Sequence, residues 1–304
     1  MTMRLPLALE RLVRSLEQRL NRPLLSREPP AAFLDEWQAR SVADTLRAQR
    51  PELLVTLTTF QRPAELARLI DALSRELPAL SPRVFVCVLS DRSDGLDDAF
   101  PRRLLAERFG VRSAWVDARE HMGKQRFWRT YQTLFALAQA AQAQRLLSLQ
   151  DDVELAPDFG TQLHQAWHDT GVADPQRRVL YLFSSEDDEP DGRWIHFPRV
   201  EHTSMRVRRT DWFDLQGFML DRPGLDLLRY WMVPVPAWRW RKDPSLSSGV
   251  GRQLTQRLSG RGTVYQCHPP LIGHGGSASM MNPQARQKRS LDNQSFLQSH
   301  RPGR

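Results

Sequence analysis

The stretch LLVTLTTFQRPAELARLIDAL, residues 53–73, decides the fold of this chain. Its first seven residues form an unbroken run of apolar and β-branched side chains, which is typical of a strand buried on both faces. Pro63 then opens an amphipathic segment that continues to Glu76, and proline is well suited to the first turn of a helix. The stretch therefore predicts a buried strand at 53–59 followed directly by a helix at 63–76.

Strand and helix patterns keep alternating after this first unit. We expect a strand at 84–89, a helix near 97–108, a strand near 111–117, a long helix near 123–144 and a strand at 145–149. Strands that alternate with helices at this spacing predict a parallel sheet with right-handed crossovers. The polar residues that follow the strands, above all Asp91, Asp151 and Asp152, should then meet at the carboxyl edge, where such sheets bind ligands.

The two ends of the chain and its second half follow a less regular pattern. We expect strands at 179–184, near 193–197, near 216–220 and at 263–266, with helices near 223–231 and 245–258. Residues 1–50 have the pattern of two amphipathic helices, the second around 32–48. We interpret 1–50 as a helical appendage, 51–283 as the main domain and 284–304 as a basic, flexible tail. The first helix could instead lie on a membrane surface, although it lacks a dominant basic face.

The overall composition is that of an ordinary soluble protein. The chain has 304 residues, of which 40% are hydrophobic and 26% are charged. No apolar run is long enough to span a bilayer, and charged residues interrupt the N-terminus where a signal peptide would be apolar. Cys87 and Cys267 form neither a disulfide framework nor a metal-binding spacing, which suits a reducing compartment. We expect a location in the cytoplasm of a bacterium or of a phage-infected host.

The charge balance is strongly basic. The formal net charge is +8, which favours a polyanionic partner such as nucleic acid, an acidic glycan or an anionic membrane. Only Lys124, Lys242 and Lys288 are lysines among the 43 basic residues. A GC-rich genome would produce such an excess of arginine without any selection for binding, so both interpretations stay open.

Gln150-Asp151-Asp152 is the first pattern that points to chemistry. Adjacent carboxylates at the end of an apolar strand raise each other's pKa, and a buried charge without a partner is costly. A divalent cation shared with a diphosphate would compensate both effects, because Mg²⁺ and Mn²⁺ take oxygen ligands from carboxylates and phosphates. The alternative is an exposed turn or a helix N-cap with no ligand.

Four segments together resemble the motifs of glycosyltransferases with the GT-A fold. In chain order they are LLVTLTTFQRP, VFVCVLSDRSDG, RLLSLQDDVELAPDF and VYQCHPPLIGHGGSASMM, between residues 53 and 281. The resemblance is to family-2-like members, and it extends to phage-type enzymes that attach sugars to DNA bases. It implies an α/β, Rossmann-like fold, with a mixed, mostly parallel sheet flanked by helices. It also implies inverting transfer of a sugar from a nucleoside diphosphate donor, with UDP favoured, to a hydroxyl acceptor.

The resemblance assigns the donor contacts to the loops that follow the first strands. Thr59 and Arg62 lie in the Thr-Thr-aromatic-x-Arg-Pro turn that meets the nucleotide, and Asp91 occupies the position that reads the nucleobase. Lys124 stands at the start of the long helix, where its charge and the helix N-terminus suit the diphosphate; a solvated first turn is the alternative.

The metal assignment is less definite than the donor assignment. The acidic motif is Gln-Asp-Asp instead of Asp-x-Asp, so the principal ligand of Mn²⁺ or Mg²⁺ is Asp151 or Asp152. We favour Asp152, with His274 completing the site as the resemblance implies and Asp151 contacting the ribose or sugar. A histidine between glycines is also compatible with an ordinary surface loop.

The acceptor side is predicted from a loop rich in tryptophan and arginine. The resemblance to inverting GT-A enzymes implies that Asp243 is the catalytic base, and its alternative role is an N-cap before Pro244. Aromatic rings stack on sugars and bases while arginines pair with phosphates, so the candidate acceptor residues are Trp238, Arg239, Trp240 and Arg241. Packing of these tryptophans onto the core is the alternative.

The identity of the acceptor stays open between two classes. The basic charge and the Trp/Arg loop favour a hydroxymethylated base in DNA, whereas envelope glycans or lipid-linked saccharides are commoner acceptors of family-2-like enzymes. A function of another class is a non-catalytic nucleic-acid-binding protein built on a decayed GT-A domain. Against that alternative, the carboxylates and the histidine stand at all the expected positions.

Overall fold

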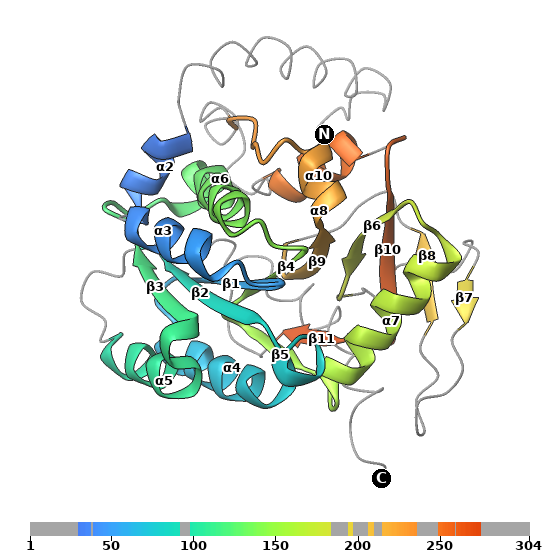
Figure 1. Cartoon of the computed structure of the whole chain (residues 1–304), viewed down its shortest axis with the longest axis horizontal. Helices are drawn as coiled ribbons and strands as arrows, with labels where there is room; N and C mark the ends of the chain where they lie inside the picture. The colour runs from blue at the N-terminus through green and yellow to red at the C-terminus, as the bar shows by residue number, and fades with distance from the viewer. Residues whose placement is uncertain are drawn as a thin grey trace, which may run out of the picture.

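A computed structural model of the chain describes residues 30–37, 39–91, 98–183, 194–196, 206–209, 215–235, 249–258 and 260–274. Of residues 30–32, 194–196, 206–209, 252 and 274 it describes the backbone alone. The described part of the chain forms a nine-stranded sheet with helices on both faces (Figure 1). None of the described helices is long and apolar enough to span a membrane.

The sheet is mixed and mostly parallel, as predicted. Its strand order is β3-β2-β1-β4-β9-β6-β10-β8-β7, and β8 and β9 run against the other strands. Their bounds are β1 Leu53–Thr59, β2 Val84–Ser90, β3 Ser113–Asp117, β4 Arg145–Gln150, β6 Arg177–Tyr181, β7 Trp194–His196, β8 Arg206–Arg209, β9 Gly217–Asp221 and β10 Thr263–His268. A separate two-stranded sheet pairs β5 (Val153–Leu155) with β11 (Ile272–His274).

Helices cover both faces of the large sheet. Figure 1 shows α4 (Pro63–Glu76), α5 (Ala99–Phe109) and α7 (Phe159–Ala173) on one face, and α2 (Pro30–Glu36), α3 (Arg40–Gln49) and α6 (Gly123–Ala141) on the other. Two further helices in the second half of the chain are α8 (Arg222–Leu227) and α10 (Val250–Leu258). This three-layer arrangement is the expected solution for strands that are apolar on both faces.

The order of the strands creates a switch point between β1 and β4. The chain steps outward from β1 to β2 and β3 through α4 and α5, and α6 then returns it to β4 on the other side of β1. The order of the strands therefore reverses at β1 and β4, and in sheets of this type a crevice opens at the carboxyl ends of the strands where the order reverses. The two strand ends are tied together, because Asp151 N donates to Thr58 O at 3.0 Å.

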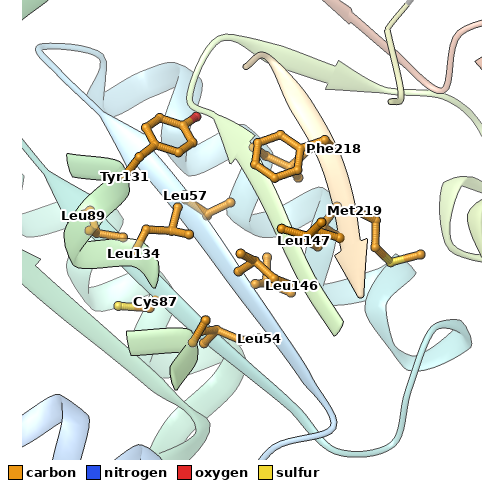
Figure 2. Close-up of a cluster of buried hydrophobic side chains, with 14 of the residues drawn as sticks. Leu54, Leu57, Cys87, Leu89, Tyr131, Leu134, Leu146, Leu147, Phe218 and Met219 are labelled. Carbon is orange, nitrogen blue, oxygen red and sulfur yellow. The ribbon is translucent and has the colours of Figure 1, made fainter. Parts of the chain in front are cut away.

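The core lies where β1, β2, β4 and β9 pack against α6. Figure 2 shows the apolar side chains of this cluster, all of them buried: Leu54, Leu57, Cys87, Leu89, Tyr131, Leu134, Leu146, Leu147, Phe218 and Met219. Truncation of one such leucine to alanine typically costs about 2–5 kcal/mol, so this packing holds the strand ends of the switch point in place.

The predicted helix around 32–48 is wrong in one respect, because it is two helices. The helix is interrupted between α2 and α3, and Trp37 and Ala39 in this interruption are both fully buried. Phe33 packs edge-on against Trp128 of α6, with ring centroids 6.1 Å apart. Burial of the break itself outweighs continuation of the helix, and hydrophobic periodicity alone does not reveal this.

The second half of the sheet departs furthest from the prediction. The strand predicted near 216–220 is β9, which runs antiparallel between β4 and β6, a position and direction that the sequence did not predict. The strand predicted at 179–184 is β6 at 177–181, and the short strands β5, β8 and β11 were not predicted. Strands of three or four residues are too short to show the alternation that identifies a strand.

Candidate active site

A cleft of about 220 Å³ opens at the switch point. We call it the switch-point cleft. It is lined by the ends of β1, β2 and β4 and by the first turns of α6, through Thr58, Thr59, Phe60, Arg62, Leu89, Asp91, His121, Gly123, Lys124, Phe127, Thr130, Gln150, Asp151 and Asp152. The structure thus brings together every predicted donor residue and the predicted metal ligand Asp152.

Asp151 is held by neutral donors from the end of β1. Its Oδ2 accepts a hydrogen bond from Thr59 Oγ1 at 2.7 Å and another from Phe60 N at 3.0 Å. Burial, followed by the neighbouring charge of Asp152, raises the pKa of the Asp151 carboxyl to about 7, and the two hydrogen bonds and Arg62 only partly oppose this. This carboxyl therefore exchanges its proton near neutral pH.

Asp152 has a different partner, which carries a charge. Its Oδ2 lies 2.7 Å from Nη1 of Arg62, the residue before Pro63 at the start of α4, and the two side chains are 7% and 8% exposed. A buried carboxylate with a guanidinium at this distance has its charge compensated within the protein. The two aspartates, equivalent in the sequence, thus occupy distinct environments.

The residues present fit a divalent cation. Asp152 supplies carboxylate oxygen to the wall of the cleft, and Mg²⁺ and Mn²⁺ often use only one or two carboxylates together with substrate phosphates. Within the described side chains, no three or more of His, Cys, Asp and Glu gather in a group that could hold a metal. His274 is described by its backbone alone, so its coordination stays a prediction.

The backbone of His274 nevertheless lies next to the acidic pair. In the sheet of β5 and β11, His274 is paired in register with Val153, the residue that follows Asp152. The glycine-flanked histidine and the acidic motif are far apart in the sequence, and the pairing of two three-residue strands joins them.

Asp91 organises the start of α6. Its Oδ1 accepts from Met122 N at 2.5 Å and its Oδ2 from Gly123 N at 2.9 Å, while Nδ1 of His121 lies 3.2 Å from Oδ2. A carboxylate at this place satisfies orphan N–H groups and faces the positive end of the helix dipole. Gly123 has φ of +55°, a left-handed conformation that favours glycine. Lys124 follows on the first turn and lines the cleft.

Two aromatic side chains of the cleft were not identified from the sequence. The rings of Phe60 and His121 are stacked, with centroids 4.4 Å apart and planes at 22°. Phe60 is the aromatic residue of the predicted turn, but nothing in its sequence marks His121 as its partner. The contact depends on how the fold places the loop after β1 beside the residues that precede α6.

The predicted acceptor residues lie outside the described residues. This applies to Asp243 and to Trp238, Arg239, Trp240 and Arg241. The segment that leads to them is described as far as residue 235 and is firmly held. The buried side chain of Gln132 in α6 donates to Tyr230 O at 3.0 Å and accepts from Met232 N at 2.7 Å. The side chain of Gln253 in α10 donates to Val233 O and accepts from Val233 N.

The sequence matches no protein-family model and no curated protein. Solved structures similar to this one include TarS 1–349 from S. aureus, with a TM-score of 0.44, 13% identity, and coverage of 71% of this chain and 60% of that chain. They also include the mannosyltransferase PcManGT from Pyrobaculum calidifontis in complex with GDP-Man and Mn²⁺, with a TM-score of 0.46, 15% identity, and coverage of 91% and 77%. The match to TarS 1–349 thus spans less than two thirds of that chain's length.

Proposed function

We propose that this protein is a nucleotide-sugar-dependent glycosyltransferase of the GT-A type. The observation that carries the proposal is the switch-point cleft, where the acidic pair after β4 faces Arg62, Asp91 and the N-terminus of α6. Such a cleft offers anionic groups for a metal beside the cationic side chains of Arg62 and Lys124 for a diphosphate. The four sequence segments that resemble GT-A motifs contribute three of the loops that line it.

The donor in this proposal is a nucleoside diphosphate sugar, with UDP favoured as the nucleotide. The diphosphate binds at the first turn of α6, near Lys124, and the nucleoside lies toward Thr59, Asp91 and the stacked Phe60 and His121. Aromatic rings at a cleft wall offer a face for a planar base. Asp151 contacts the ribose or the sugar, held in place by its bond to Thr59.

Asp152 holds Mn²⁺ or Mg²⁺ in this proposal, with His274 as the second protein ligand. When bound, the metal supplies Lewis-acid stabilisation of the departing nucleoside diphosphate. Asp243 takes the proton of the acceptor hydroxyl as a general base, which belongs to a single displacement with inversion. Trp238, Arg239, Trp240 and Arg241 contact the acceptor.

The favoured acceptor is a hydroxymethylated base in DNA. The net charge of +8 and the alternation of tryptophan and arginine at 238–241 support an acceptor that carries both phosphates and rings. A bacterial envelope glycan is the second candidate. Transfer of a radiolabelled sugar to hydroxymethylcytosine-containing duplex and to envelope glycans distinguishes them. We expect label in the DNA and a steep fall in DNA binding as salt rises; label in the glycan alone overturns the DNA assignment.

Calorimetric titration with UDP and with GDP tests the proposed class. We expect nucleotide binding that depends on Mn²⁺ and that disappears in Asp152→Ala. The matched control is Asp117→Asn, because Asp117 is a half-exposed carboxylate at the end of β3, paired with Arg102 and outside the cleft. Absence of Mn²⁺-dependent binding of either nucleotide to the wild type would remove the glycosyltransferase proposal. Unchanged binding in Asp152→Ala would remove only the ligand assignment.

A further inference from the structure

We propose that Arg62 is an internal counter-cation for Asp152, which releases that carboxylate to the metal when a donor diphosphate arrives. Metal and diphosphate would then bind cooperatively, each raising the affinity of the protein for the other. This inference rests on the proposed function, because it concerns how the same cleft receives a nucleoside diphosphate and a divalent cation.

Arg62 and Asp152 form a buried ion pair. Arg62 and Asp152 lie 2.7 Å apart with almost no solvent exposure, so the carboxylate already has a cation beside it. A divalent ion that binds Asp152 would add a second cation in a poorly solvated place, and like charges repel strongly there. Metal alone therefore competes with Arg62 and binds weakly.

Arg62 is also placed where a bound diphosphate could reach it. Arg62 and Asp152 both line the switch-point cleft, and so do Gly123 and Lys124 at the start of α6. A guanidinium binds phosphate oxygens through two parallel hydrogen bonds, so a diphosphate in this cleft offers it a new anionic partner. The backbone need not move, since Arg62 O stays bonded to Leu66 N at 3.0 Å in the first turn of α4.

The two aspartates differ in the kind of group that holds them. Asp151 is held by the hydroxyl of Thr59 and the N–H of Phe60, which are neutral donors that keep the carboxyl in one orientation. Only Asp152 is paired with a cationic side chain that a diphosphate can attract away. The exchange of one cation for another is therefore assigned to Asp152. By thermodynamic reciprocity, diphosphate must raise metal affinity by the same factor as metal raises diphosphate affinity.

Titrations of Mn²⁺ followed by electron paramagnetic resonance, with and without UDP or GDP, test the inference. For the wild type we expect nucleotide to raise Mn²⁺ affinity about tenfold or more. In Arg62→Gln, Mn²⁺ alone should bind about tenfold more tightly than in the wild type, and nucleotide should raise its affinity by a smaller factor than in the wild type, because only direct contact between metal and phosphate remains. Arg62→Lys keeps the charge and should keep most of the coupling. Arg75→Gln is the matched control, because Arg75 is an exposed arginine on the same helix, paired with Asp71.

Thermal unfolding in Mn²⁺ alone provides a second readout. Mn²⁺ should raise the melting temperature of Arg62→Gln more than that of the wild type, even where the metal-free variant is unstable. Without the Arg62 guanidinium, Mn²⁺ is the cation that compensates the buried carboxylate of Asp152. Equal Mn²⁺ affinity and equal coupling in Arg62→Gln and wild type, or weaker Mn²⁺ binding in the variant, overturn the inference and leave the proposed function intact. Failure of the wild type to bind Mn²⁺ and nucleotide together overturns the proposed function instead.

Discussion

The carboxylate of Asp91 shows how one residue sets the shape of a binding surface. It accepts hydrogen bonds from the N–H groups of Met122 and Gly123 and so fixes the start of α6, where Lys124 in the first turn and His121 just before the helix line the cleft. We expect Asp91→Ala to destabilise the protein by about 2 kcal/mol, because two helix N–H groups lose their acceptor. Urea unfolding measures the change. Asp91→Asn, which keeps a carbonyl acceptor, should lose about half as much, and an equal loss in both variants would contradict the capping role.

Asp151 gives the metal-free protein a dependence of stability on pH. Its carboxyl has a pKa of about 7 in the fold against 3.8 for an ordinary aspartate, so between these values the unfolded chain releases the proton and the folded chain keeps it. The contribution of Asp151 to folding stability therefore falls as pH rises from about 4 to 7 and then levels off. In EDTA at pH 8, Asp151→Asn should be more stable than the wild type by about 1–3 kcal/mol, with the difference gone at pH 4.

Denaturant titrations of wild type and Asp151→Asn at several pH values check this prediction. Asp117→Asn serves as the control, because Asp117 is half exposed and its variant should show no such growing advantage at high pH. A constant difference between Asp151→Asn and wild type across the pH range would show that burial does not favour the protonated carboxyl.

At the scale of single residues, the sequence predicts several of the side chains that line the cleft but not how they pair. Thr59, Arg62, Asp91, Lys124 and the acidic pair share one cleft because parallel strands end at a common edge, which the pattern predicts. The ion pair of Arg62 with Asp152 and the stacking of Phe60 on His121 were not predicted. Both join side chains from separate loops, and their contacts depend on rotamers and on strand register that no local pattern encodes.

Elements with strong local signals were predicted well, and elements whose place is set by distant partners were not. The bounds of β1 and α4 agree with the prediction, because a β-branched run and a proline at the first helical turn mark them. The position of β9 between β4 and β6 follows from pairing with strands far away in the sequence. The break between α2 and α3 follows from burial of Trp37.

Glutamine side chains of α6 and α10 form hydrogen bonds with the backbone of residues 230–233. Gln132 satisfies both a carbonyl and an N–H of this segment from a fully buried position. We expect Gln132→Ala to cost about 2–4 kcal/mol, because it removes the partners of a buried N–H and of a partly buried carbonyl. Amide hydrogen exchange at 230–233 should accelerate in the variant. Gln139→Ala, an exposed position on the same helix, is the control, and equal exchange in both variants would contradict the prediction.

For the molecule as a whole, the packing of α2 and α3 bears on where the chain can be shortened. Phe33, Trp37 and Leu46 belong to the same buried cluster as the central strands. We expect Trp37→Ala to lower the free energy of unfolding by about 3–5 kcal/mol, and removal of residues 1–50 to abolish cooperative unfolding. Phe100→Ala, at a residue that is 53% exposed, should change stability by less than about 0.5 kcal/mol. A truncated chain that melts cooperatively would show that 1–50 is a separable appendage.

The placement of β9 has a consequence for the synthesis of the protein on the ribosome. β4 is translated first and β6 second. The strand that pairs with both of them, β9 at residues 217–221, is translated later. The other edge of β6 stays unpaired until β10 has been translated. Until then the nascent chain presents open strand edges of buried, apolar sequence, which are the sites where partly made chains associate with one another. Nascent chains that end before β9 are therefore the ones for which a chaperone matters most.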